Sequence, residues 1–169
     1  MKIGRFLLTA SAAIAALAAP AAAKPDYSGD IKADYDKSLG ALWDHFHRNP
    51  ELSFREFKTA ARMAQELRAI PGLVVTEKVG QTGVVGVLKN GDGPVVLVRA
   101  DMDGLPVQER SGYANASTVR QVGVDGLEMP VMHACGHDVH ITSLVGTARQ
   151  LARLKDRWKG TVIFIVQPA

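Results

Sequence analysis

The chain has 169 residues and a mass of 18.1 kDa, with 47% hydrophobic and 22% charged residues. This composition excludes a disordered tail, a low-complexity repeat and a miniprotein that depends on disulfides. The net charge of +3 is small and the basic residues are scattered, so a nucleic-acid partner is not expected. Length and charge therefore indicate one globular domain.

The first residues have the pattern of a secretory signal peptide. Lys2 and Arg5 accompany an apolar stretch over residues 6–17, and residues 21–23 are alanines that fit a cleavage site. We expect a signal peptide over residues 1–23, cleavage after Ala23, and export to the periplasm or the medium. A retained membrane-spanning helix is the alternative, but the stretch is too rich in alanine, so no stable membrane anchor is expected.

Two amphipathic helices are predicted next. Apolar residues over 39–46 fall at helical spacing, and this helix is expected to end near residues 49–50, Asn-Pro. Ser53 and Glu56 have the spacing of a capping box that starts a second helix. The second helix is expected to end at residues 71–72, Pro-Gly.

The period then changes to that of β-strands. Short runs rich in valine over residues 74–79, 84–88 and 95–98 predict three strands. The Asn-Gly-Asp-Gly sequence at residues 90–93 predicts a hairpin turn, which makes the last two strands antiparallel neighbours. The polar stretch over residues 106–130 is too long for a simple connection and predicts a functional or interface loop.

A third helix and a buried strand complete the predicted fold. Apolar residues return at helical spacing over 139–154, and residues 161–166 form a continuous apolar run, typical of a strand buried on both faces. The element order, two helices, three strands, a helix and a strand, predicts an α/β fold with a mixed β-sheet sandwiched by helices.

The segment His-Ala-Cys-Gly-His-Asp-Val-His at residues 133–140 predicts a metal site. Thiolate and imidazole bind zinc and neighbouring divalent metals, and Cys135 and His137 stand on either side of the flexible Gly136. Cys135 is the single cysteine, so an intramolecular disulfide is excluded. A buried apolar thiol among hydrogen-bonded histidines, and a cysteine nucleophile activated by histidine, are the alternatives.

A second polar cluster follows the strand at residues 95–98. Carboxylates at a strand end occupy the position where α/β sheets form active sites, and Asp103 could accept a hydrogen bond from a metal-bound histidine. Alternatively, Asp101 and Asp103 cap the turn or pair with Arg99. The two histidines of the first helix, His45 and His47, do not share a helical face, so we interpret them as surface or structural residues.

Four motifs together resemble a known family. They stand at residues 47–54 with Glu56, 99–106, 133–140 and 165–169. In order and spacing they are similar to the N-terminal part of the amidohydrolase branch of the dinuclear metallopeptidases, which includes hippurate hydrolases, N-acyl-amino-acid deacylases and indole-3-acetyl-amino-acid hydrolases.

The resemblance implies a partial zinc-exopeptidase-like catalytic domain over residues 24–169 and a separate lid domain through which the complete enzyme forms a homo-oligomer. It implies two divalent metal ions, whether zinc, manganese, cobalt or nickel, with Cys135 and His137 as ligands. Asp103 matches the residue that supports a metal ligand. The implied substrate is a small N-acyl amino acid or a short peptide.

The family places a Glu-Glu pair, comprising the general base and a further ligand, directly after the Gln-Pro-Ala that here stands at residues 167–169. We therefore expect the chain to be the N-terminal part of a longer enzyme that hydrolyses the amide bond of N-acyl amino acids, and to be inactive alone. An exopeptidase acting on short peptides and a non-catalytic truncated product are the alternatives.

Overall fold

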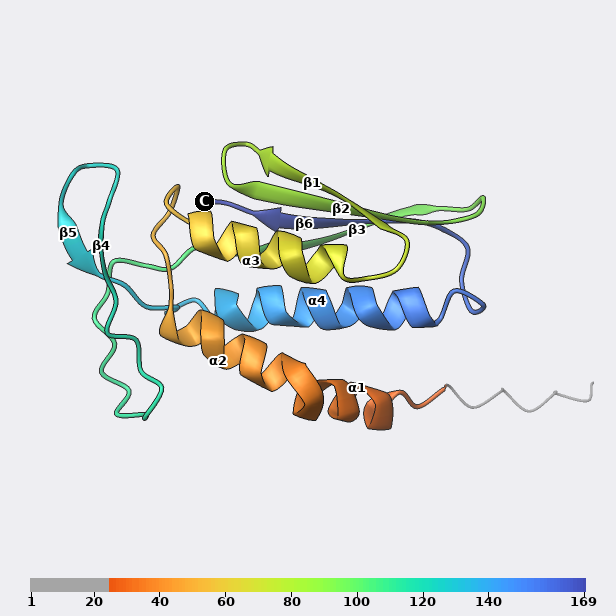
Figure 1. Cartoon of the computed structure of the whole chain (residues 1–169), viewed down its shortest axis with the longest axis horizontal. Helices are drawn as coiled ribbons and strands as arrows, with labels where there is room; N and C mark the ends of the chain where they lie inside the picture. The colour runs from red at the N-terminus through yellow and green to blue at the C-terminus, as the bar shows by residue number, and fades with distance from the viewer. Residues whose placement is uncertain (1–24) are drawn as a thin grey trace, which may run out of the picture.

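The computed structural model describes residues 25–169, so the predicted signal peptide lies outside the described residues (Figure 1). None of the described helices is long and apolar enough to cross a membrane. The elements are α1 (Ser28–Asp34), the π-helical turn η1 (Tyr35–Leu39), α2 (Gly40–Arg48), α3 (Phe57–Arg68), β1 (Leu73–Val79), β2 (Gly83–Asn90), β3 (Val95–Asp101), β4 (Arg120–Val122), β5 (Glu128–Pro130), α4 (His137–Arg153) and β6 (Gly160–Gln167).

The main sheet has the strand order β1-β2-β6-β3. Strand β6 pairs antiparallel with β2 and parallel with β3, which makes the sheet mixed, as predicted. The prediction that β2 and β3 are antiparallel neighbours is wrong, because β6 lies between them. The backbone N–H of Thr161 donates to the carbonyl of Pro94, which fixes β6 beside the start of β3. The Asn-Gly-Asp-Gly turn therefore reverses the chain without forming a two-stranded hairpin.

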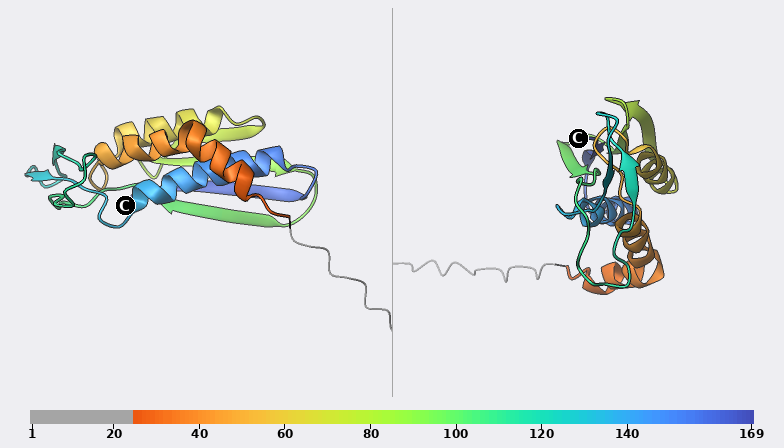
Figure 2. Two further views of the ribbon diagram at one scale, coloured as in Figure 1. Left: turned by 90° about the horizontal axis from the view of Figure 1, so that it is seen from below. Right: turned by 90° about the vertical axis from the view of Figure 1, so that its left-hand side faces the viewer.

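The helices lie in two layers on one face of this sheet (Figures 1 and 2). Helices α3 and α4 contact the strands, and α1 and α2 pack on the far side of α4. Alternate residues of β6 are buried against the helices, whereas Ile163 and Ile165 on the other face are half-buried. The expectation that this strand is buried on both faces is therefore met on the helix-covered face only.

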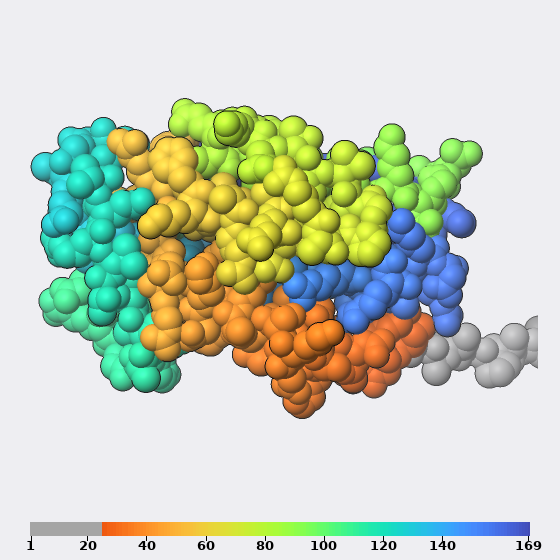
Figure 3. Space-filling model, in the orientation of Figure 1, coloured from red at the N-terminus to blue at the C-terminus, as the bar shows by residue number. Residues whose placement is uncertain are grey.

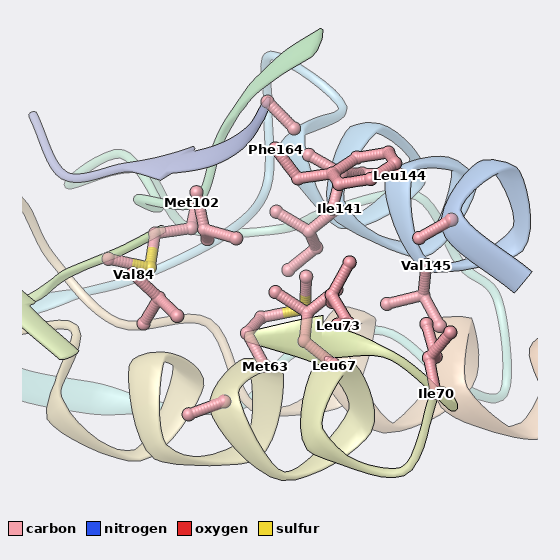
Figure 4. Packing of buried hydrophobic residues seen from close by; sticks show 14 of the residues in the cluster. Met63, Leu67, Ile70, Leu73, Val84, Met102, Ile141, Leu144, Val145 and Phe164 are labelled. Carbon is pink, nitrogen blue, oxygen red and sulfur yellow. The ribbon is translucent and has the colours of Figure 1, made fainter. Parts of the chain in front are cut away.

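The hydrophobic core lies between the sheet and the inner helices (Figure 4). Met63 and Leu67 from α3, Ile141 and Val145 from α4, and Phe164 from β6 are all completely inaccessible to solvent. Each such side chain contributes about 1.5–3 kcal/mol through burial. This packing fixes α4 relative to the sheet, and with it the position of the helix N-terminus.

Helix α3 begins at Phe57, three residues later than the proposed capping box requires. Phe54 has a φ of 61°, which a right-handed helix excludes. The backbone N–H groups of Lys58 and Thr59 donate instead to the buried carboxylate of Glu51, at 3.2 and 2.7 Å. The capping-box prediction is wrong, because Glu51 takes the role that the sequence pattern assigned to Ser53.

One end of the molecule collects the segments that carry the predicted site. The N-termini of α3 and α4 and the carboxyl ends of β3 and β6 all lie there (Figure 1). Residues 106–130 cover this end (Figure 3). This segment is not a loop throughout, because β4 and β5 pair antiparallel within it, a small hairpin that the sequence did not predict.

Candidate metal centre

The segment that contains Cys135 and His137 forms a tight turn into α4. Gly136 is the residue before the helix and has a φ of 72°, in the left-handed region that favours glycine. His137 is the first residue of the helix, and the thiol of Cys135 is free and exposed. The alternative of a buried apolar thiol is therefore wrong. The turn leaves the cysteine accessible to a ligand.

The side chain of His137 is held by Asp103. Its Nδ1 lies 3.0 Å from Asp103 Oδ1 and 2.9 Å from the Asp103 carbonyl oxygen. Both oxygens are acceptors, so Nδ1 carries a proton, and in the neutral ring the lone pair is on Nε2. Backbone hydrogen bonds between Leu105 and Met132, at 2.8 and 3.1 Å, hold the two loops together. This is the arrangement in which a histidine presents Nε2 to a metal ion.

The two aspartates that follow β3 point to different partners. Asp101 forms an ion pair with Arg99, with 2.5 Å between the Arg99 Nη2 and Asp101 Oδ1 atoms. Asp103 is buried and faces His137. The alternative of pairing with Arg99 is therefore correct for Asp101 and wrong for Asp103.

A buried polar network anchors the same end of α4. The Asp138 carboxylate accepts hydrogen bonds from Trp43 Nε1 at 3.0 Å and from His47 Nδ1 at 2.8 Å. The other ring nitrogen of His47 lies 3.3 Å from the Glu109 carboxylate, which also accepts from the backbone N–H of Ser117 at 2.6 Å. His47 is thus structural, in agreement with the interpretation from the sequence, but the network of hydrogen bonds was not predicted. Its members are distant in sequence. The one sequence signal for the network is that Asp138 directly follows His137.

His133, two residues before Cys135, is buried. Neither of its ring nitrogens has a hydrogen-bond partner within residues 25–169. Burial lowers the pKa of His133 to about 4, and this outweighs the opposing effect of the Asp138 carboxylate. The imidazole is therefore neutral at physiological pH and adds no positive charge beside His137.

The donor set of Cys135 and His137 fits a divalent metal. An exposed thiol and an imidazole with a free Nε2 are ligands that zinc and its neighbours accept. Within the part of the chain that the structure describes, no group of three or more His, Cys, Asp or Glu side chains is placed so that it could hold a metal ion. The described residues thus present two candidate ligands, Cys135 and His137, and one carboxylate, Asp103, that contacts His137.

An apolar cavity of about 660 Å³ lies elsewhere, between α1, η1 and α4. Tyr35, Leu39 and Val139 are among its lining residues, and Cys135, His137 and Asp103 are not. This cavity is therefore separate from the candidate metal centre.

Comparison with known proteins agrees with these features. Residues 97–169 match the family described as Peptidase family M20/M25/M40. The chain is 42% identical over 124 residues to N-acetylcysteine deacetylase of Bacillus subtilis, covering 73% of this chain and 30% of that protein. It is 40% identical over 141 residues to hippurate hydrolase of Campylobacter jejuni, covering 83% of this chain and 33% of that protein. The chain thus spans about a third of the length of these curated relatives.

The fold agrees as well. A crystal structure of a Bacillus subtilis protein, described as a dinuclear metal binding peptidase from the M20 family, matches with a TM-score of 0.70 and 38% identity. The match covers 82% of this chain and 36% of that one. Sequence and fold together confirm the predicted resemblance: residues 97–169 match the M20 peptidase family, and the chain is similar to one part of these longer proteins.

Proposed function

We propose that the protein is a metal-dependent hydrolase of the amide bond of N-acyl amino acids. The observation that carries this proposal is the orientation of His137: Asp103 holds Nδ1 and leaves Nε2 free, and the exposed Cys135 stands two residues earlier in the same turn. The names of the relatives, a deacetylase of N-acetylcysteine and a hydrolase of hippurate, support the substrate class.

In this proposal Cys135 and His137 are metal ligands, and Asp103 fixes the tautomer and the ring orientation of His137. The carboxylate also raises the electron density at Nε2, which strengthens its bond to a cation. Gly136 allows the turn that presents the thiol. Divalent metal ions, when bound, supply polarisation of the amide carbonyl and activation of water.

Two ligands do not complete a metal site, and a proton shuttle is also needed for hydrolysis. We assign the remaining ligands and the general base to portions of a longer protein, since the relatives are about three times as long as the matched segment. On this proposal the 169-residue chain binds metal but does not hydrolyse substrate. The complete protein takes up two metal ions and forms a homo-oligomer.

Metal binding at Cys135 tests the proposal directly. The rate at which a thiol reagent modifies the chain is measured with and without saturating zinc. We expect zinc to protect Cys135 in the wild-type chain and to give less protection in His137→Ala. Equal rates with and without zinc would instead favour a non-catalytic product. A second assay measures amine release from N-acetylcysteine and hippurate by the chain and by the complete protein.

An exopeptidase acting on short peptides is the second candidate. It is favoured by the structural neighbour from Bacillus subtilis, which is described as a peptidase. The kcat/KM values of the complete protein for dipeptides and for N-acyl amino acids separate the two candidates. A higher value for dipeptides would replace the first proposal by the second.

We also propose that residues 1–23 direct export and are removed. The intact mass of the native product tests this, because cleavage after Ala23 gives a chain that begins at Lys24. A product that retains Met1 would contradict the proposed cleavage.

A further inference from the structure

The segment that precedes α3 lies against the loop that carries Asp103. Leu52 and Gly104 form a parallel β-bridge, and the backbone N–H of Gly104 donates to the carbonyl of Glu51 at 2.6 Å. In the same segment the hydroxyl of Ser53 donates to Asp103 Oδ2 at 2.9 Å. Backbone pairing and a side-chain hydrogen bond thus both place Ser53 beside the Asp103 carboxylate.

This close approach depends on Gly104. A Cβ atom at this position would lie 2.9 Å from the Val131 Cγ1 atom, closer than real Cβ contacts come, and 3.0 Å from the Pro50 Cβ atom, which is closer than nearly all of them. The segment is also anchored at its other end, because the Glu51 carboxylate accepts from Thr59 at the start of α3. Ser53 is therefore held between a helix start and the Asp103 loop.

The two oxygens of the Asp103 carboxylate have separate partners. Oδ1 accepts from His137 Nδ1 at 3.0 Å, and Oδ2 accepts from the Ser53 hydroxyl at 2.9 Å. The terminal torsion of an aspartate is broad, so a single hydrogen bond leaves the carboxylate free to turn. A second donor on Oδ2 removes this freedom and directs Oδ1 at the histidine.

We propose that Ser53 is a positioning residue of the metal centre: its hydroxyl orients Asp103, which in turn holds His137 with Nε2 free for the metal. The metal-binding part of this inference rests on the proposed function. Ser53 has no competing role as a helix cap, because Glu51 caps α3. The hydroxyl is therefore available for the site.

The test compares Ser53→Ala with Ser53→Thr, which keeps the hydroxyl. The matched control is Ser38→Ala, because Ser38 is also half-buried and binds a side chain, that of Arg149, at 2.8 Å. The first readout is the ¹⁵N NMR signal of the His137 ring nitrogens in the metal-free chain. We expect a single Nδ1–H tautomer in the wild type, a mixture of tautomers in Ser53→Ala, and the wild-type signal in the other two variants.

The second readout is the affinity for Co²⁺, followed by the absorption of the cobalt–thiolate bond at Cys135. We expect Ser53→Ala to weaken binding by about 3- to 10-fold, less than the ~10–100-fold typical for a direct partner of a ligand histidine. Ser53→Thr and Ser38→Ala should bind as the wild type does.

Unchanged His137 signals in Ser53→Ala would overturn the proposal, and so would an equal loss of Co²⁺ affinity in Ser38→Ala. If the wild-type chain binds no Co²⁺, the proposed function fails, but the NMR signals of the metal-free chain still decide whether Ser53 positions His137. The two failures are therefore distinguishable.

Discussion

His137 and His47 both place Nδ1 on a carboxylate, but they differ at the other ring nitrogen. Asp103 holds His137 at 3.0 Å and leaves its Nε2 free. Asp138 holds His47 at 2.8 Å, and Glu109 lies 3.3 Å from its Nε2. The side chains of the two histidines are equally accessible, at 16% each.

Burial therefore does not separate a candidate ligand from a structural histidine, whereas the occupancy of the second nitrogen does. A ring whose two nitrogens both face carboxylates has neither nitrogen open to a cation and connects two segments of the chain. A ring with one carboxylate is oriented and still able to bind. The comparison predicts that changes at the two histidines affect different properties of the protein.

The largest expected effect is the loss of metal binding in His137→Ala. We expect Co²⁺ affinity to fall by more than about 100-fold, because removing a ligand should cost more than removing its outer partner. The same change at His47 should cost less than about 10-fold, since both of its ring nitrogens already face carboxylates. Titration of both variants with Co²⁺ measures the difference. Equal losses of affinity would contradict the inference that His137 and His47 have different roles.

The next effect concerns the Asp103 carboxylate, which contacts His137. Asp103→Ala is expected to weaken Co²⁺ binding by about 10–100-fold, because His137 loses the acceptor that orients it. Asp101→Ala is the matched control, since Asp101 pairs with Arg99 at the surface. A similar loss in both variants would show that the effect is not specific to the contact with His137.

For His47 the comparison predicts a loss of stability. His47→Phe keeps the ring beside Trp43 but removes the donor to Asp138, a buried acceptor. We expect the free energy of unfolding, measured in urea, to fall by about 1–3 kcal/mol. His45→Phe is the control, because His45 is exposed on the same helix. A smaller loss in His47→Phe than in the control would contradict the structural role.

Local patterns predicted the elements of this fold well but not their pairing. The strands at residues 84–88 and 95–98 are present, yet the turn between them suggested a hairpin that β6 interrupts. A turn motif reports only on neighbours in sequence, whereas the position of β6 depends on contacts across more than sixty residues, such as Thr161 with Pro94.

In the candidate metal centre, too, the sequence predicts residue types better than contacts between distant residues. The contact between Asp103 and His137 could be predicted, because these residue types have specific ligand chemistry and match a family pattern. The roles of Cys135 and His137 as metal ligands stay a prediction. Ser53 was assigned to a capping box by its spacing to Glu56, and the structure gives it to Asp103 instead. Several acceptors compete for one hydroxyl, and only the folded chain decides which of them is near.

The smallest expected effect is the pH dependence that Glu109 adds to the His47 network. Burial acts to raise its pKa, but hydrogen bonds from Ser111 and Ser117 and the proximity of His47 outweigh this and lower the pKa below the usual 4.5. As the pH falls, the Glu109 carboxyl is therefore protonated in the unfolded chain before it is protonated in the folded chain. The stabilising contribution of Glu109 is thus present above pH 4.5 and is lost as the pH falls through the pKa of the folded chain. Unfolding free energies between about pH 6 and pH 3 should decline more steeply in the wild type than in Glu109→Gln. If the two unfolding free energies fell in parallel, the network would not stabilise the ionised form of Glu109. The proposed contact between Glu109 and His47 would then not contribute to stability.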